Sequence, residues 1–530
     1  MQEKRPPNTF RPPAPRTCDR WPRGGVRMVW APELAGLALV MALQPGCTVG
    51  PDFEPPRAPL PAHWPGLAES AGRVTVAPVD IDWWRGFGDP LLAALEERAA
   101  TSNLSLRAAA VRLAQVRAQR DIVAAAEWPS WHGNAGYTRL KPSEKGIFSQ
   151  IGRLLGGGSG GADLGTSARG VGAGVIGIPA AQIKPFSLWQ YGFDAAWELD
   201  LWGRVRRELE SAEANLEASA EAERDLRLSV MAEVARDYIE LRRIQRVRQL
   251  TEDHLASAEE TLRLTERRAA RELVSDLDVA QARTQRDEIA AQLPRLNQQE
   301  AQAINRLSLL LGQPPRALRR ELAAARPLPP LPPRVPIGLP AELARRRPDI
   351  RRAEAQLHAA TAEIGVAVAD FYPRLTLSGS FGLQALQFKD LGNWAARQYA
   401  LGPTLTVPIF EGGRLKATLE LREAQQQEAA IAYHDTVLRA LHEVDDALTA
   451  YGEEQRRHDA LTEALRWSRE ALDLARRRYQ VGVTSFLPVL EAQRALLRLE
   501  QEQADSRAAL GTRLVALYKA LGGGFEVSGR

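Results

Sequence analysis

Thiol chemistry is possible at two positions only, because the 530-residue chain contains two cysteines, Cys18 and Cys47. Cys47 follows a mostly apolar segment, 29–43, and the small residue Gly46, and basic side chains precede that segment. A charged region, an apolar region and a small residue in this order are typical of a secretory signal. The sequence therefore predicts a leader over residues 1–46, with Met28 as an alternative start, and lipidation of Cys47 as the first mature residue.

The lipidation motif itself is irregular. Leu usually stands three residues before the modified cysteine, but this chain has Gln44 there and Leu43 one step further away. Ordinary cleavage nearby is therefore the alternative. Cys18 would leave with the leader, so no internal disulfide is expected. Thr48 follows the cysteine in place of the Asp that would suggest inner-membrane retention.

Other reactive side chains form no recognisable motif in the sequence. The histidines lack the spacing of zinc ligands, and no nucleophile elbow or catalytic triad is present. The Gly-rich run 154–161 is not followed by Gly-Lys-Ser/Thr, so it is not a phosphate-binding loop. We therefore expect no enzyme activity, no cofactor and no metal site.

Charge also argues against nucleic acid as a partner. Lys and Arg outnumber Asp and Glu by four over the whole chain. Residues 1–46 hold seven basic and three acidic side chains, which accounts for the entire excess. A chain that starts at Cys47 would be formally neutral, so a binding mode driven by basic charge is not predicted.

An internal repeat organises the chain. Arg204, Ser275 and Leu311 match Arg414, Ser485 and Leu521 at a constant offset, and upstream Trp128-Pro129 matches Tyr372-Pro373. Each copy reads as a helical stretch (91–127 or 341–370), two short alternating segments and a long helical stretch. The expected segments are a leader (1–46), an N-terminal equatorial segment (47–90), the first repeat (91–324), a Pro-rich extended link (325–340), the second repeat (341–522) and a tail (523–530).

Four short segments alternate between apolar and polar residues, two in each copy. They lie near 131–139, 189–197, 375–383 and 399–407, and several begin or end on aromatic residues. This pattern is typical of transmembrane β-strands of about nine residues, with rings at the two interfaces. A soluble half-buried hairpin would show the same alternation. Four strands cannot close a barrel in lipid, so the membrane interpretation requires several chains to pool their strands.

Two long helical stretches follow, Arg204–Leu311 and Arg414–Leu521. Each is interrupted near Ser275 or Ser485, which predicts antiparallel pairs of about 65 and 35 residues, the longer helix reaching roughly 100 Å. A plain soluble coiled coil is the alternative. Pro294 lies within one of these helices and should kink it. The basic run Arg345–Arg347 is interpreted as part of a helix start.

Several segments closely resemble the TolC-like outer-membrane factor family, in particular its lipoprotein branch that serves resistance-nodulation-division pumps. The segments that carry this resemblance are Cys47–Pro56, Trp83–Leu91, Arg346–Ala355, Phe371–Leu375 and Gly402–Arg414. The likeness runs from Cys47 to about Gly522 with its spacing intact.

The resemblance implies a mixed α+β membrane protein that closes as a homotrimer. Three chains would form a 12-stranded barrel in the outer membrane and a 12-helix barrel in the periplasm, with a mixed equatorial belt. The partners implied are outer-membrane lipid, a periplasmic adaptor and an inner-membrane efflux pump. The function implied is a passive exit duct for small molecules such as drugs. Type I protein secretion through the same duct, or a periplasmic scaffold without a pore, are the alternatives.

The same resemblance implies a gate at the periplasmic tip. The segment Tyr479–Glu491 matches the family's tip, with an apolar residue at Leu487 and a carboxylate at Glu491. Some relatives carry a second carboxylate where this chain has Pro488. We expect Pro488 in the first turn of a helix whose N-cap is Ser485. A solvated helix charge is the other interpretation of Glu491.

Overall fold

A computed structural model describes residues 48–56, 61, 63–64, 74–77, 82–141 and 185–523. The leader, Cys47, most of the Gly/Ser-rich loop and the tail beyond residue 523 lie outside these described residues. The chain divides into two compact units. The first comprises residues up to 51, 121–209 and 364–419, and the second comprises 52–120, 210–363 and the chain from 420 onward.

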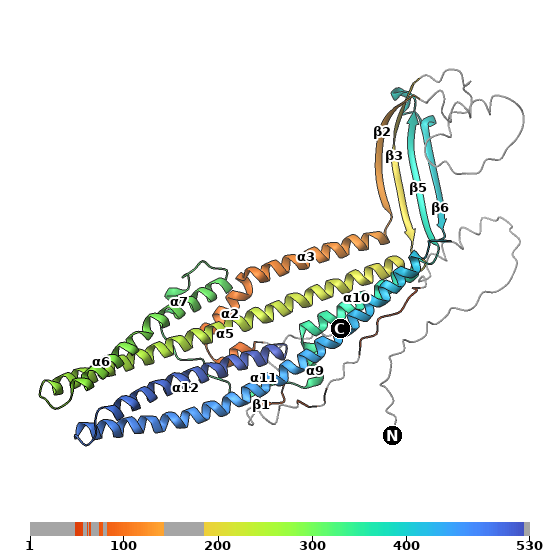
Figure 1. The fold of residues 1–530 in the computed structure, drawn as a ribbon. Coiled ribbons are helices and arrows are strands. Elements are labelled where there is room, and N and C mark those ends of the chain that lie inside the picture. The colour runs from red at the N-terminus through yellow and green to blue at the C-terminus, as the bar shows by residue number, and fades with distance from the viewer. Residues whose placement is uncertain are drawn as a thin grey trace, which may run out of the picture. The chain divides into compact units, whose positions relative to one another are not determined.

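A four-stranded antiparallel sheet dominates the first unit, and its strands lie side by side (Figure 1). The strands are β2 (Ser130–Leu140), β3 (Phe186–Leu199), β5 (Arg374–Ala385) and β6 (Arg397–Thr406), in the order β2-β3-β5-β6. Alternation along each strand sends successive side chains to opposite faces. Phe193 pairs with Phe381, and Phe381 pairs with Tyr399, so aromatic residues from three strands lie in one row.

Long helices account for most of the second unit, and the first turns of α5 and α11 belong to the first unit. They are α5 (Arg204–Ala269), α6 (Asp276–Ala290), α7 (Gln292–Leu310), α11 (Arg414–Gln480) and α12 (Leu487–Ala520). α5 has 66 residues and α11 has 67, so each is about 100 Å long at 1.5 Å per residue. Each reverses through a short turn into its antiparallel partner, α6 or α12 (Figure 1).

The α6–α7 pair is broken where α12 is continuous. α6 ends at Ala290 and α7 begins at Gln292, so Pro294 lies in the first turn of α7. Proline removes one backbone N–H and its ring crowds the carbonyl of the residue four positions earlier, here Ala290. A break at this point is the expected effect of Pro294. α12 has Ala504 at the equivalent position and continues through it.

Two stretches expected to be single helices are each divided in two. The first forms α2 (Pro90–Ser102) and α3 (Leu104–Ala124), and the second forms α9 (Pro340–Arg346) and α10 (Pro348–Ala369). Asn103 causes the first break, because its side-chain oxygen accepts a hydrogen bond from the Leu106 N–H and its amide donates to the Leu310 carbonyl. Pro348 causes the second, because proline disfavours helical backbone at the residue before it.

The largest hydrophobic core lies in the second unit. It joins the turn around Trp83 and Phe87 to α2, to the middle of α5 and α11, and to the end of α12. The Pro-rich link runs across this region in extended form, and its strand β4 (Val335–Pro336) pairs in parallel with β1 (Val74–Thr75). The Trp64 indole donates to the Gly338 carbonyl at 3.1 Å. The N-terminal segment and the link are therefore fixed to each other.

A buried polar contact anchors α2 in this core. The Asp89 carboxylate caps α2 by accepting from the Leu91 and Leu92 N–H groups, and it also accepts the Tyr238 hydroxyl at 2.7 Å. Burial and this hydrogen bond raise the pKa of Tyr238 to about 12. No helix in the described part of the chain is both long enough and apolar enough to cross a membrane.

Candidate functional site: the sheet and the helix tips

One face of the sheet is apolar and exposed. Its aromatic and aliphatic side chains come from all four strands, and each is exposed in the single chain: Trp131, Tyr137, Tyr191, Phe193, Phe381, Tyr399 and Leu401. Among the four strands only Gly382 is buried. A soluble sheet would cover such a face with other elements of the chain, because exposed apolar area of this size is unfavourable in water. The described residues of this chain leave it uncovered.

The opposite face is polar. Residues that alternate with the aromatic row include His132, Asn134, Gln190, Asp194 and Gln384. The Asn134 amide donates to the Asp194 carboxylate across the β2–β3 pair, and the Gln384 amide donates to the Gln190 side-chain oxygen at 3.4 Å. The sheet therefore presents one surface suited to lipid and one suited to water.

Both outer strands of the sheet have an unpaired edge. β2 pairs only with β3 and β6 pairs only with β5 among the described residues. An open strand edge exposes backbone donors and acceptors to which another strand can pair. The loop after β6 adds to this exposed region, because Ile409 is 93 % and Phe410 is 90 % exposed.

The N-terminal residues pack at the junction between β3 and the first turn of α5, within the first unit. The Val49 N–H donates to the Trp202 carbonyl at 3.1 Å, and Trp202 stacks on Tyr372. The Trp202 indole also donates to the Pro373 carbonyl at 2.9 Å. Thr48 lies so close to Gly203 that an added Cβ there would be 2.7 Å from its methyl group. Cys47 lies outside the described residues, but the residue that follows it is fixed at this junction.

The helix tips are the turns that join the antiparallel pairs. We call residues 270–275, between α5 and α6, the first tip, and residues 481–486, between α11 and α12, the second tip. Gly482 adopts a φ of 77°, which favours glycine at this sharp reversal. Tyr479 and Phe486 pack together beneath the second tip with their ring centres 5.5 Å apart.

Apolar side chains are exposed at both tips. They are Leu273 at the first tip and Val481 and Val483 at the second, and the exposed Leu277 and Leu487 follow in the first turns of α6 and α12. Leu487 is the first residue of α12 and is 47 % exposed, while the adjacent Phe486 is buried. The structure therefore places Leu487 at the surface of the second tip.

Glu491 lies one turn after Leu487 on α12 and is exposed. No described residue forms a hydrogen bond or ion pair with its carboxylate. The neighbouring Arg494 is instead directed to α6, where it donates to the Gln285 side chain at 2.5 Å and to Glu288 at 3.1 Å. The Leu487 and Glu491 side chains are thus on the same helix, near its start, and free to contact another molecule.

The N-cap expected at Ser485 is wrong. α12 begins one residue later, with Phe486 at the N-cap position and no side-chain cap. The first tip shows why. There Ser275 caps α6 by accepting from the Asp278 N–H, and the Asp278 carboxylate accepts from the Ser275 N–H. Pro488 stands at the position equivalent to Asp278 and has no N–H to donate, so Ser485 cannot make this capping box.

One contact between α5 and α11, next to the two tips, was not predicted from the sequence. The Arg268 guanidinium donates to the Tyr479 and Gln480 carbonyl oxygens at 3.4 and 3.2 Å. The Arg268 side chain comes from the last turn of α5, where a basic residue is favoured by the helix dipole. The basic residue in the last helical turn could have been noticed in the sequence. The partners of Arg268 on α11 are distant in sequence and could not be inferred from that position.

Long paired helices and a sheet with one apolar exposed face define the class of outer-membrane channels. A family model described as outer membrane efflux protein matches residues 95–313 and 339–523. The chain therefore belongs to the outer membrane efflux protein family, which confirms the resemblance found in the sequence. Its function is that of an outer-membrane efflux channel.

Relatives with named functions span nearly the whole chain. The toluene efflux pump outer membrane protein TtgI of Pseudomonas putida is 34 % identical, over 91 % of this chain and 96 % of TtgI. OprJ of Pseudomonas aeruginosa is 34 % identical, over 93 % of this chain and 97 % of OprJ.

Solved channel structures share the fold. The outer-membrane channel OprN is 35 % identical, covers 90 % of this chain and 99 % of its own, and superposes with a TM-score of 0.79. The open-state MtrE channel of Neisseria gonorrhoeae is 28 % identical, with 90 % and 98 % coverage and a TM-score of 0.73.

Proposed function

We propose that three copies of this chain close into one duct through the outer membrane and conduct small molecules out of the periplasm. The observation that carries the proposal is the four-stranded sheet with an exposed aromatic face and two unpaired edges. Backbone groups at an open edge cannot be satisfied in lipid, so β2 of one copy must pair with β6 of the next. Three copies contribute 12 strands, which exceeds the eight of the smallest closed barrels.

Exposed apolar residues on the long helices support the same closure. Val111 and Ile122 on α3, and Leu421 and Ile431 on α11, are exposed in the single chain. Large apolar side chains exposed on a helix are suited to packing against a partner surface. In the proposed trimer these residues pack against neighbouring helices of a 12-helix periplasmic barrel.

The internal two-fold plan supports equivalent roles for the two halves of the chain. α5 and α11 differ in length by one residue, and α7 and α12 end in the same way. Gly312 and Gly522 both adopt positive φ. In both places the glycine N–H and the next N–H donate to carbonyl groups in the last turn of the helix. Each half thus supplies one long and one short helix to the proposed barrel.

The names of the relatives support small molecules as cargo. TtgI is named for toluene, and OpmQ of Pseudomonas aeruginosa is named for pyoverdine export. By analogy we propose that this duct receives its substrates from an inner-membrane pump through a periplasmic adaptor. We further propose that Cys47 carries lipid, because Thr48 lies against Gly203 and Val49 bonds to Trp202, whose ring stacks on Tyr372. Such an aromatic pair favours the membrane interface.

The gate is proposed at the second tip. In a trimer, three Glu491 carboxylates and three Leu487 side chains would surround the axis. The exposure of both side chains and the absence of a partner for Glu491 among the described residues support this role. A ring of carboxylates attracts cations and repels anions at the narrow end of a pore.

Cysteine cross-linking tests the closure directly, because a Cys18→Ala background leaves only Cys47 as a native thiol. Asn134→Cys on β2 should be combined with a cysteine at Gln398, Ala400 or Gly402 on β6 to sample the register. We expect covalent trimers in at least one register, while Asn134→Cys alone stays uncross-linked. Monomers in all three registers would contradict the closure.

Planar-bilayer recording tests conduction separately. The purified protein should form pores, and loosening the second tip should increase their conductance. A protein that forms trimers but conducts no ions, even after Glu491→Ala, would instead support a scaffold without a pore. Mass spectrometry of the mature N-terminus should show an acylated Cys47, and an unmodified N-terminus at another residue would contradict lipidation.

A further inference from the structure

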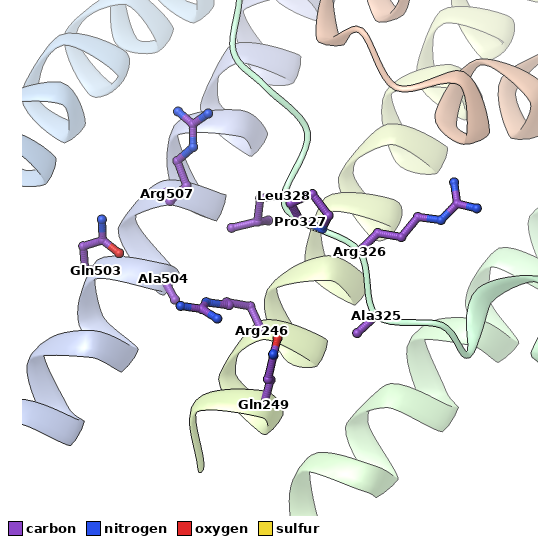
Figure 2. Close-up of a pocket in the computed structure, with 9 residues that line it drawn as sticks. All are labelled: Arg246, Gln249, Ala325, Arg326, Pro327, Leu328, Gln503, Ala504 and Arg507. Atoms are coloured by element: carbon purple, nitrogen blue, oxygen red, sulfur yellow. The ribbon is translucent and has the colours of Figure 1, made fainter. Parts of the chain in front are cut away.

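A cavity of about 370 Å³ lies in the second unit, where α5, α12 and residues 325–328 of the link meet (Figure 2). α5 and α12 form its two sides and the extended link passes between them in this view. Its polar lining comes from all three segments: Arg246, Gln249, Arg326, Gln503 and Arg507. Neither the sheet nor the tips contribute to it, so it is distinct from the exposed apolar face of the sheet and from the proposed gate.

Three arginines give the cavity a positive lining. Arg246, Arg326 and Arg507 line it, and no carboxylate of the described residues does. None of the three guanidinium groups forms an ion pair or hydrogen bond with a described residue. Most arginines on these helices are paired, as Arg243 shows: three residues before Arg246, it contacts Glu240 and Asp505, each at 2.7 Å.

Arg507 makes this imbalance costly. Its side chain is half-buried on α12, three residues after the buried Ala504, and burial lowers the pKa of its guanidinium. A cation that leaves water without a counter-charge loses hydration free energy. A carboxylate placed against it would recover that loss through two parallel, charge-assisted hydrogen bonds.

The arrangement suits a ligand with separated acidic groups better than a single small ion. In Figure 2 the Arg246 side chain points from α5 toward α12, whereas the Arg326 and Arg507 side chains point in other directions. The cavity also exceeds the roughly 30 Å³ occupied by one water molecule about tenfold. Because the three guanidinium groups point in different directions, a ligand with several carboxylates can pair with more of them than a compact anion can.

The remaining lining matches a peptide. The Gln249 and Gln503 side chains each offer an amide donor and a carbonyl acceptor, which can pair with a peptide backbone. Pro327 and Leu328 provide apolar contact along the link. We propose that this cavity binds an acidic peptide segment of a partner protein, with carboxylates placed on Arg246, Arg326 and Arg507.

Fluorescence anisotropy with the detergent-solubilised full chain tests this assignment. The probe is a fluorescein-labelled peptide, Glu-Ala-Leu-Glu, at low ionic strength, and the comparison peptide has Gln in place of both Glu residues. We expect Arg507→Gln to weaken binding of the acidic peptide about tenfold or more, since a hydrogen bond to a charged group contributes about that factor. Arg507→Lys should restore part of the affinity.

Arg498→Gln is the matched control. Arg498 is on the same helix as Arg507, and its replacement by Gln removes the same charge. The nine residues between them correspond to two and a half turns, so Arg498 is on the opposite side of α12. The Arg498→Gln variant should bind the acidic peptide with the same affinity as the unsubstituted protein. Equal weakening by Arg498→Gln, or equal binding of the Gln peptide, would overturn the proposal. Citrate or inorganic phosphate binding more tightly than the acidic peptide would also overturn it, in favour of a small-anion site.

Discussion

The guanidinium carbon of Arg268 lies 4.7 Å from the centre of the Tyr479 ring. The N–H groups at the edge of the same guanidinium donate to the Tyr479 and Gln480 carbonyl oxygens. Its planar face contacts the Tyr479 ring, so both parts of the group bind the end of α11. Arg268 belongs to α5, and the contact therefore fastens one helical pair to the other just above the tips. A gate built from these tips can open only if this contact is loosened or moves with them.

Arg268→Gln should therefore increase the resting conductance of the reconstituted channel. Glutamine has no charge to place over the Tyr479 ring, and its shorter side chain offers one amide nitrogen where the guanidinium uses two. The neighbouring Arg267→Gln is the control, because Arg267 is exposed and, among the described residues, its guanidinium donates only to the Arg263 carbonyl of its own helix. Single-channel recording measures the effect. Unchanged closed-state current in Arg268→Gln would show that the contact does not restrain the gate.

Glu491→Gln should weaken block of the channel by multivalent cations applied from the periplasmic side. Removing three carboxylates around the axis removes the attraction for such ions, and we expect the blocking concentration to rise roughly tenfold or more, equivalent to about 1.4 kcal/mol. Glu502→Gln is the control. Glu502 is 11 residues further along α12, which places it on nearly the same side of the helix but about 16 Å further from the tip than Glu491. Equal effects of the two substitutions would argue against a ring at Glu491.

Pro488→Asp should rebuild at the second tip the capping box seen at the first. The introduced aspartate would supply both the N–H and the carboxylate that Asp278 supplies to Ser275, and a serine cap stabilises a helix by about 1 kcal/mol. We expect a higher Tm for the variant. Adding Ser485→Ala should remove most of the gain, while Ser485→Ala alone should have little effect. A gain that survives Ser485→Ala would show that it comes from charge alone.

The sequence predicted the elements that depend on local periodicity. The alternating segments lie within or at the ends of β2, β3, β5 and β6, and the long stretches form α5 and α11. A period of two or of 3.6 residues is written directly into the apolar pattern, so such elements can be inferred without a structure.

Contacts between distant segments could not be inferred in this way. The break at Asn103 depends on the Leu310 carbonyl, which is far away in sequence. The contact of Arg268 with Tyr479 likewise joins helices from different repeats. At the second tip, the sequence showed both Ser485 and Pro488, and the missing N–H of Pro488 could have been recognised as incompatible with a capping box. Glu491 was identified by resemblance, and its exposure comes from the structure.

Gly50→Ala should displace the N-terminal segment from the junction beside Trp202. Gly50 has a φ of 90°, and an added Cβ would lie 2.5 Å from the Cα atom of Gly365. The backbone strain alone costs of order 1–3 kcal/mol. Hydrogen exchange of residues 48–56 should become faster. Gly86→Ala is the control, because an added Cβ there has no atom within 4 Å. Unchanged exchange in Gly50→Ala would show that this close approach does not hold the segment.

The stability of Glu96→Gln relative to the unsubstituted protein should increase from acidic to neutral and alkaline pH. Glu96 is fully buried on α2, and both carboxylate oxygens lack a hydrogen-bond partner among the described residues. Burial raises the pKa of this carboxyl well above its usual value of 4.5. The folded chain therefore retains a proton that the unfolded chain releases above about pH 4.5.

The sign of the effect follows from this proton. Its stabilising contribution is complete below pH 4.5 and declines as the pH rises toward the folded-state pKa, by at most about 1.4 kcal/mol per pH unit. Glutamine cannot ionise, so the Tm of Glu96→Gln minus that of the unsubstituted protein should increase between pH 5 and pH 8. Glu97→Gln changes the adjacent, exposed carboxylate and should show no such trend. A constant Tm difference for Glu96→Gln would mean that Glu96 titrates normally in the folded protein.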